Sequence, residues 1–116
     1  MYTYKSLIER FMEKYYENND NILGFSFFYM AYALTRIIKQ DEKHEELKQI
    51  NNKIILYKTT GSLDILYEIK ADIEKKHYRH VLFLLDELKD VRPADFFDDV
   101  TNVTKSFGSF AFVIED

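Results

Sequence analysis

One uncharged run constrains this chain more than any other feature. The fifteen residues from Asn21 to Thr35 carry no charge, five of them are aromatic, and Asp20 and Arg36 flank them. As a helix the run would be roughly 22 Å long, because an α-helix rises ~1.5 Å per residue. A bilayer core needs ~20 residues, whereas a helix that is apolar on all sides is typical of a protein core. We therefore predict a buried central helix over residues 22–39 and no membrane partner.

The composition favours one folded domain over residues 1–116. Hydrophobic residues make up 47% of the chain, which supports a core and excludes general disorder. Three glycines and one proline are too few for the many turns of an all-β sandwich. The chain has no cysteine, so disulfide and thiolate chemistry are excluded. This composition fits a reducing, cytoplasmic location, where we expect the protein.

Apolar residues recur at three- and four-residue steps along most of the chain, which predicts a mainly α fold. We expect a compact bundle of four to five helices with an extended C-terminal arm. Besides the central helix, the expected helical segments include residues 3–18, 41–60 and 71–92, and a short helix follows Pro93. The stretch around His77 is polar on all sides, and this predicts that the third of these segments breaks into two helices there.

Several residues are typical of helix ends. Thr3 or Ser6 can cap the first helix, and Asp41 can cap the helix that follows the central one. Gly61 suits a left-handed C-cap, so we expect a helix to stop there. Gly24 lies near the start of the central helix, where glycine lowers the helix propensity by a small amount.

Residues 53–69 also allow a β-hairpin, which would make the fold α+β. Four apolar side chains there are spaced two apart, as in a strand: Leu63, Ile65, Tyr67 and Ile69. A third strand at about 107–114 would then complete the sheet, because an isolated two-stranded hairpin is marginal in water. Leu66, Ile69 and Ile73 fit helical spacing equally, and we favour the helical interpretation.

No motif in the sequence points to catalysis, a metal or a cofactor. Glu74, His77 and His80 would share one helix face, but no fourth metal ligand is set by their spacing. The basic stretch from Lys70 to His80 could contact a phosphate backbone, although acidic residues are interleaved with it. The glycine-containing segments are too short for a phosphate-binding loop. We therefore expect no enzymatic activity and no cofactor, and we consider nucleic acid an improbable partner.

The acidic charge is concentrated in the last third of the chain. Residues 1–80 have a net charge of +1 and residues 81–116 a net charge of −5, which together give the −4 of the whole chain. Aromatic residues set among charges are a common pattern at protein interfaces. The candidate partner-binding residues are Asp95, Phe96, Phe97, Asp98 and Asp99. The alternative for the two phenylalanines is that one or both pack into the core.

These observations predict a small acidic intracellular module that binds a protein with a basic surface. By analogy of class, we expect a stoichiometric inhibitor of the immunity-protein, antitoxin or phage anti-defence type. One alternative is a self-associating structural or scaffold protein, such as a homodimer, that buries the apolar arm Phe107–Ile114 between subunits. A second alternative is a regulatory nucleic-acid binder that uses Lys70–His80.

Overall fold

The computed structural model describes residues 3–38 and 44–88, and every regular element in these two ranges is helical. The elements in chain order are α1 (Tyr4–Glu17), α2 (Ile22–Ile38), α3 (His44–Thr60), α4 (Leu63–Asp72), the π-helical turn η1 (Ile73–His77) and α5 (Tyr78–Glu87). The predicted mainly helical bundle is confirmed. The expected C-terminal arm, the helix after Pro93 and the cap at Asp41 fall outside the described residues.

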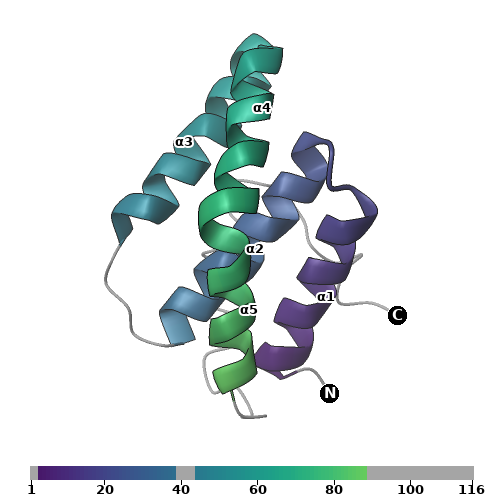
Figure 1. The fold of residues 1–116 in the computed structure, drawn as a ribbon, viewed down its shortest axis with the longest axis vertical. Coiled ribbons are helices and arrows are strands. Elements are labelled where there is room, and N and C mark those ends of the chain that lie inside the picture. Colours follow the sequence, from purple (N-terminus) through teal and green to yellow (C-terminus); the bar gives the residue numbers. More distant parts are fainter. Residues whose placement is uncertain (1–2, 39–43, 89–116) are drawn as a thin grey trace.

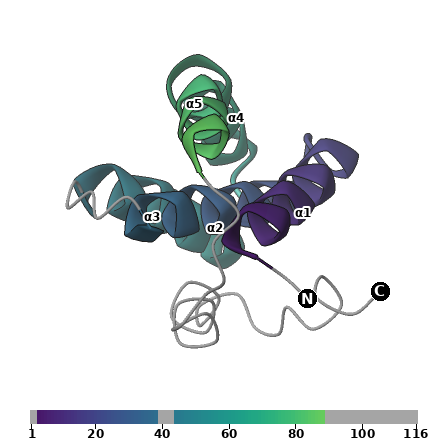
Figure 2. The same cartoon turned by 90° about the horizontal axis from the view of Figure 1, so that it is seen from below.

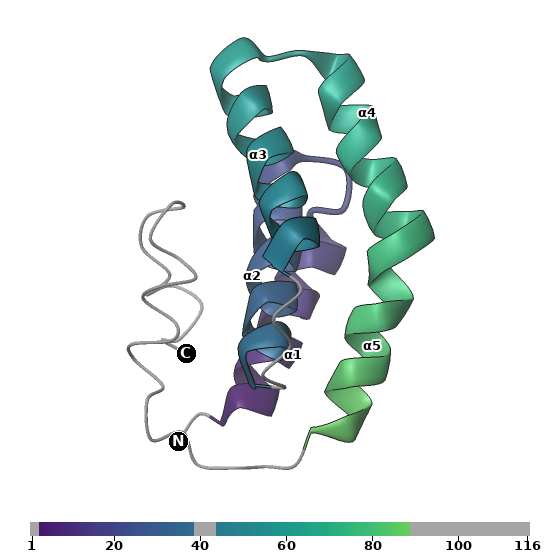
Figure 3. The same ribbon diagram turned by 90° about the vertical axis from the view of Figure 1, so that its left-hand side faces the viewer.

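The helices form two layers. In Figures 1 and 2, α1, α2 and α3 lie side by side, and α4, η1 and α5 join into one continuous rod across a face of that layer. Figure 3 shows the rod running along this face from the α3–α4 connection to the opposite end of the bundle. The central helix α2 contacts α1, α3, α4 and α5.

The predicted burial of the central helix is confirmed. The side chains of Phe25, Phe28, Ala31 and Leu34 have no exposed surface. Arg36, which bounds the uncharged run in the sequence, is also buried, and its guanidinium lies 4.8 Å from the centroid of the Tyr32 ring. None of the helices formed by residues 3–38 and 44–88 combines the length and the apolar character needed to span a bilayer.

Local signals set the start of α1 and the end of α3, as the sequence predicted. Thr3 caps α1 through a reciprocal box, because the Ser6 N–H donates to Thr3 Oγ1 at 3.0 Å and the Thr3 N–H donates to Ser6 Oγ at 2.9 Å. Gly61 adopts a φ of 67°, and its N–H donates to the Tyr57 carbonyl at 2.7 Å. A left-handed glycine of this kind ends α3, as predicted.

The alternative β-hairpin over residues 53–69 is wrong. Residues 53–60 complete α3 and residues 63–69 begin α4. The period-two pattern does not define a face, since Ile69 is buried while Leu63 is 58% exposed and Tyr67 is 62% exposed. The proposed third strand at 107–114 lies outside the described residues.

The predicted division into two α-helices near His77 is confirmed, but the chain does not break there, because it passes from α4 to α5 through a π-helical turn. The Tyr78 N–H donates to the Ile73 carbonyl, five residues back. Four buried residues are spaced four apart along the rod: Ile69, Ile73, His77 and Val81. A four-residue repeat drifts by about 40° per step on an α-helix of 3.6 residues per turn. The wider π turn reverses this drift, so all four side chains keep facing the core.

Candidate functional site

The residues predicted to bind a partner are not placed by the structure. Asp95, Phe96, Phe97, Asp98 and Asp99 lie beyond residue 88, outside the described ranges. Their role stays a prediction. A candidate site within the described residues therefore rests on other side chains.

The two histidines considered as metal ligands pack against one aromatic ring. The ring centroids of Tyr32 and His77 are 5.2 Å apart, and those of Tyr32 and His80 are 5.9 Å apart. His77 is buried, whereas Glu74 is exposed on the same π turn. In the part of the chain that the structure describes, no group of three or more His, Cys, Asp or Glu side chains is arranged to hold a metal ion.

Two cations of the basic stretch are engaged in ion pairs. Lys70 donates a hydrogen bond to Asp20, which raises the pKa of the Lys70 ammonium. The Lys76 Nζ lies 3.7 Å from an Asp72 carboxylate oxygen. Burial by itself would raise the pKa of Asp72, but the hydrogen bond and charge of Lys53, together with the charge of Lys76, lower it. These pairs reduce the positive charge that Lys70–His80 could offer a phosphate backbone.

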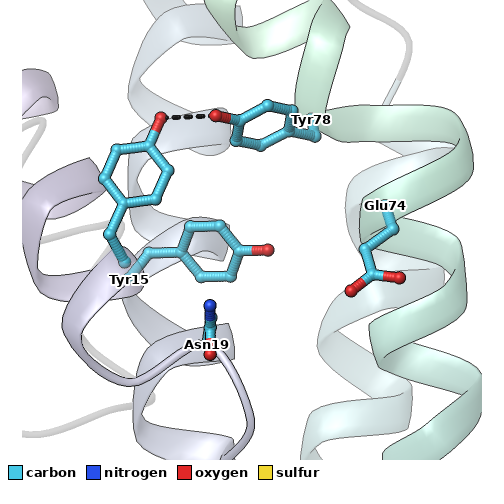
Figure 4. Close-up of a pocket in the computed structure, with 5 residues that line it drawn as sticks. Tyr15, Asn19, Glu74 and Tyr78 are labelled. Carbon is cyan, nitrogen blue, oxygen red and sulfur yellow. Dashed lines mark hydrogen bonds between the residues drawn. The ribbon is translucent and has the colours of Figure 1, made fainter.

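A pocket of about 270 Å³ lies where the end of α1 faces η1 and the start of α5. Figure 4 shows Tyr15 and Asn19 on the α1 side and Glu74 and Tyr78 on the side of the rod. We call this feature the tyrosine pocket. Its lining residues are Tyr15, Tyr16, Asn19, Glu74 and Tyr78.

Three tilted aromatic rings form most of the pocket wall. The ring centroids of Tyr15 and Tyr16 are 5.7 Å apart, those of Tyr16 and Tyr78 are 6.0 Å apart, and those of Tyr15 and Tyr78 are 6.3 Å apart. The hydroxyls of Tyr16 and Tyr78 share a hydrogen bond of 2.7 Å, drawn as a dashed line in Figure 4. This bond joins α1 to α5 and fixes two rings that would otherwise rotate.

Tyr15 and Tyr16 differ in how deeply their side chains are buried. Tyr15 is buried, and its ring packs against Phe28 of α2 with centroids 5.3 Å apart. Tyr16 follows Tyr15 on α1 and therefore points about 100° away from it, which leaves its side chain 46% exposed. Tyr15 thus anchors the pocket to the core, while Tyr16 presents an aromatic surface to solvent.

The electrostatics of the pocket are those of neutral phenols beside a carboxylate. Burial, followed by the charge of Glu74, raises the pKa of the Tyr15 hydroxyl to about 12. Burial and the hydrogen bond with Tyr78 also raise the pKa of Tyr16. Both hydroxyls are therefore protonated at neutral pH, and they can donate and accept hydrogen bonds but cannot act as bases.

No protein-family model, curated protein or solved structure gives a significant match to this chain. Functional inference consequently rests on the chemistry of its own side chains.

Sequence reasoning missed the tyrosine pocket because its walls are distant in the chain. Tyr16 and Tyr78 are 62 positions apart, and Tyr15 was visible only as one member of an apolar stripe. The adjacent pair Tyr15-Tyr16 is the one local signal. Neighbouring side chains on a helix point about 100° apart, and in this pair Tyr15 is buried while Tyr16 is 46% exposed.

Proposed function

We propose that this protein is a stoichiometric protein-binding module and that the tyrosine pocket belongs to its recognition surface. The observation that carries the proposal is the half-exposed Tyr16, held against Tyr78 by a 2.7 Å hydrogen bond and backed by buried Tyr15. Tyrosine is enriched among the residues that contribute most to protein binding, and it loses little entropy when its ring is already fixed. The pocket offers protonated phenols and one carboxylate, and such groups suit binding rather than catalysis.

The charge distribution supports a basic partner. Residues 81–116 carry a net charge of −5, and Glu74 adds a carboxylate at the pocket. Acidic surfaces steer basic proteins toward them and repel nucleic acids. We therefore keep the inhibitor class, of the immunity-protein, antitoxin or phage anti-defence type, as the leading form of this function. Asp95, Phe96, Phe97, Asp98 and Asp99 remain our proposed second contact region.

Affinity capture from the native host tests this function. We expect the wild-type chain to retain one protein in stoichiometric amount, identified by mass spectrometry. A Tyr16→Ala/Tyr78→Ala double variant should retain at least about tenfold less, since two aromatic hot-spot residues each contribute ~1–2 kcal/mol or more. The control is Tyr67→Ala, which removes a tyrosine that is 62% exposed and does not line the pocket.

The triple change of Asp95, Asp98 and Asp99 to lysine tests the second region in the same assay. It should abolish capture while the thermal unfolding of the domain stays that of the wild type. If the wild type retains no protein, or if every variant retains as much as the wild type, the proposed function is wrong.

Self-association is a second candidate function, and a particular group of side chains favours it. Four large apolar residues of α3 and α4, the two helices joined at one end of the bundle in Figure 3, are about half exposed or more: Ile55, Leu56, Leu63 and Tyr67. Exposed apolar side chains on neighbouring helices can supply the apolar surface of a contact between subunits. Sedimentation equilibrium separates the two candidates. A homodimer that dissociates in a Leu63→Lys variant would support self-association, and a strict monomer would exclude it.

A further inference from the structure

The tyrosine pocket has the shape and size of a site for one small chemical group. Three ring centroids lie within 5.7 to 6.3 Å of one another, and the ring planes are tilted by 45° to 70°. Its volume of about 270 Å³ falls just below the ~300 Å³ at which pockets for drug-sized ligands begin. The space is therefore sufficient for a single side-chain head group.

The charge of the pocket favours a positively charged ligand group over a negatively charged one. Among the five lining residues, Glu74 is a carboxylate and none is cationic. Figure 4 shows the Glu74 side chain on the wall opposite Tyr15. Aromatic faces carry negative quadrupole density, which attracts a cation within about 6 Å of the ring centroid. An anion would meet both the carboxylate and the ring faces, and both would repel it.

The negative field reaches into the pocket. After burial, the charge of Glu74 is the largest cause of the raised pKa of Tyr15, and Asp20 contributes further. A field that resists a new negative charge on the Tyr15 oxygen also attracts a positive charge placed beside it. Asp20 is itself paired with Lys70, whereas Glu74 lines the pocket and is the carboxylate that a ligand there would meet.

The position of Glu74 depends on the π turn. Glu74 is the second residue of η1, and Tyr78 follows directly after η1. The two residues are four apart on the rod and line the same pocket. π turns occur frequently at functional sites, and here the turn holds a carboxylate and an aromatic ring on one side while Ile73 and His77 stay in the core.

We propose that the tyrosine pocket binds an organic cation, namely the alkylammonium or guanidinium head group of a basic side chain on the protein partner. The rings of Tyr15, Tyr16 and Tyr78 supply the aromatic surface, and Glu74 supplies the counter-charge. The inference rests on the proposed function for the identity of the carrier, but the cation site itself can be tested without the partner.

The test compares two probes that differ only in charge. Choline carries a trimethylammonium group, and its uncharged isostere carries a tert-butyl group in the same place. We expect choline to shift the NMR signals of the tyrosine rings saturably and the isostere to leave them unchanged. Titration with butylammonium and with methylguanidinium then distinguishes a lysine-type from an arginine-type head group.

Three variants assign the binding to the proposed residues. Glu74→Gln keeps the shape of an exposed side chain, so the fold is retained, and it should weaken choline binding by about fivefold or more. Tyr78→Leu should weaken it by about five- to thirtyfold, because the cation–π contact is lost. Tyr67→Leu, at an exposed tyrosine that does not line the pocket, should change the affinity for choline by less than about twofold.

The outcomes separate the two proposals. Equal shifts with both probes, no shift with choline, or unchanged choline binding in Glu74→Gln would each overturn the cation site. If choline binds as expected but the Tyr16→Ala/Tyr78→Ala variant captures the protein partner as well as the wild type, the cation site stands and the proposed role of the pocket in partner binding fails.

Discussion

An Ala31→Asp variant of this protein is expected to lose its fold. Ala31 has no exposed surface and lies in the middle of α2, the helix that contacts all the other α-helices. A carboxylate there would be buried without a partner, at a cost of at least several kcal/mol. Folded domains of this size are stable by only about 5–15 kcal/mol, so one such charge removes most or all of that margin.

Thermal unfolding followed by circular dichroism measures this effect. We expect no cooperative transition for Ala31→Asp, and the same result for Ala33→Asp, whose side chain is also buried. The matched control is Leu23→Asp in the same helix, where the side chain is 50% exposed and a carboxylate in the first turn is favourable by about 0.3–1 kcal/mol. An Ala31→Asp protein that melts like the wild type would contradict the enclosure of α2.

A Gly24→Ala variant should be clearly less stable, although helix propensity predicts the opposite. Alanine within a helix is favoured over glycine by about 1 kcal/mol. In this fold, however, a Cβ at position 24 would lie 1.9 Å from the Asn18 carbonyl oxygen and 2.5 Å from its carbon. The short turn between α1 and α2 brings these backbone atoms together, since the Asn21 N–H donates to the same Asn18 oxygen at 3.2 Å. Backbone atoms cannot move aside as a flexible side chain can.

The expected loss for Gly24→Ala is about 1–3 kcal/mol, the usual cost of forcing extra atoms into a closely packed site. Chemical denaturation measures it, with the slope against denaturant compared between variants to confirm that the same surface is exposed on unfolding. Leu23→Ala is the control, because it changes a neighbouring exposed residue and should shift the stability by no more than about 0.5 kcal/mol. A gain in stability for Gly24→Ala would show that the α1–α2 turn is not packed as described.

The features that could be predicted from the sequence are those that depend on neighbours in the chain. The caps at Thr3 and Gly61 involve hydrogen bonds over three or four residues, and the amphipathic spacing of α1 repeats within the same range. The burial of residues 25–36 follows from an apolar run that has no polar face to turn toward water. The choice of helix over hairpin for residues 53–69 was correct, although both patterns were present.

Other features depend on contacts between distant residues. The polar stretch at 74–80 predicted a break, but His77 lies against the Tyr32 ring, and packing of this kind cannot be detected from local composition. From the sequence, Gly24 predicted only a small loss of helix propensity. In the structure, its lack of a Cβ leaves space for the Asn18 backbone. The candidate residues Asp95 to Asp99 were chosen on charge and aromaticity alone, and they lie outside the described ranges.

The sequence by itself determined that this protein is helical and that most of the uncharged run, from Phe25 to Thr35, is buried, because helix formation and apolar burial are set by spacing along the chain. Only the tertiary structure decided where the tyrosine pocket lies. Tyr16 and Tyr78 are 62 positions apart in the chain. Their hydrogen bond requires α1 and the rod to lie next to each other in the folded bundle. A contact of that kind depends on how helices assemble, and no local pattern of residues encodes it.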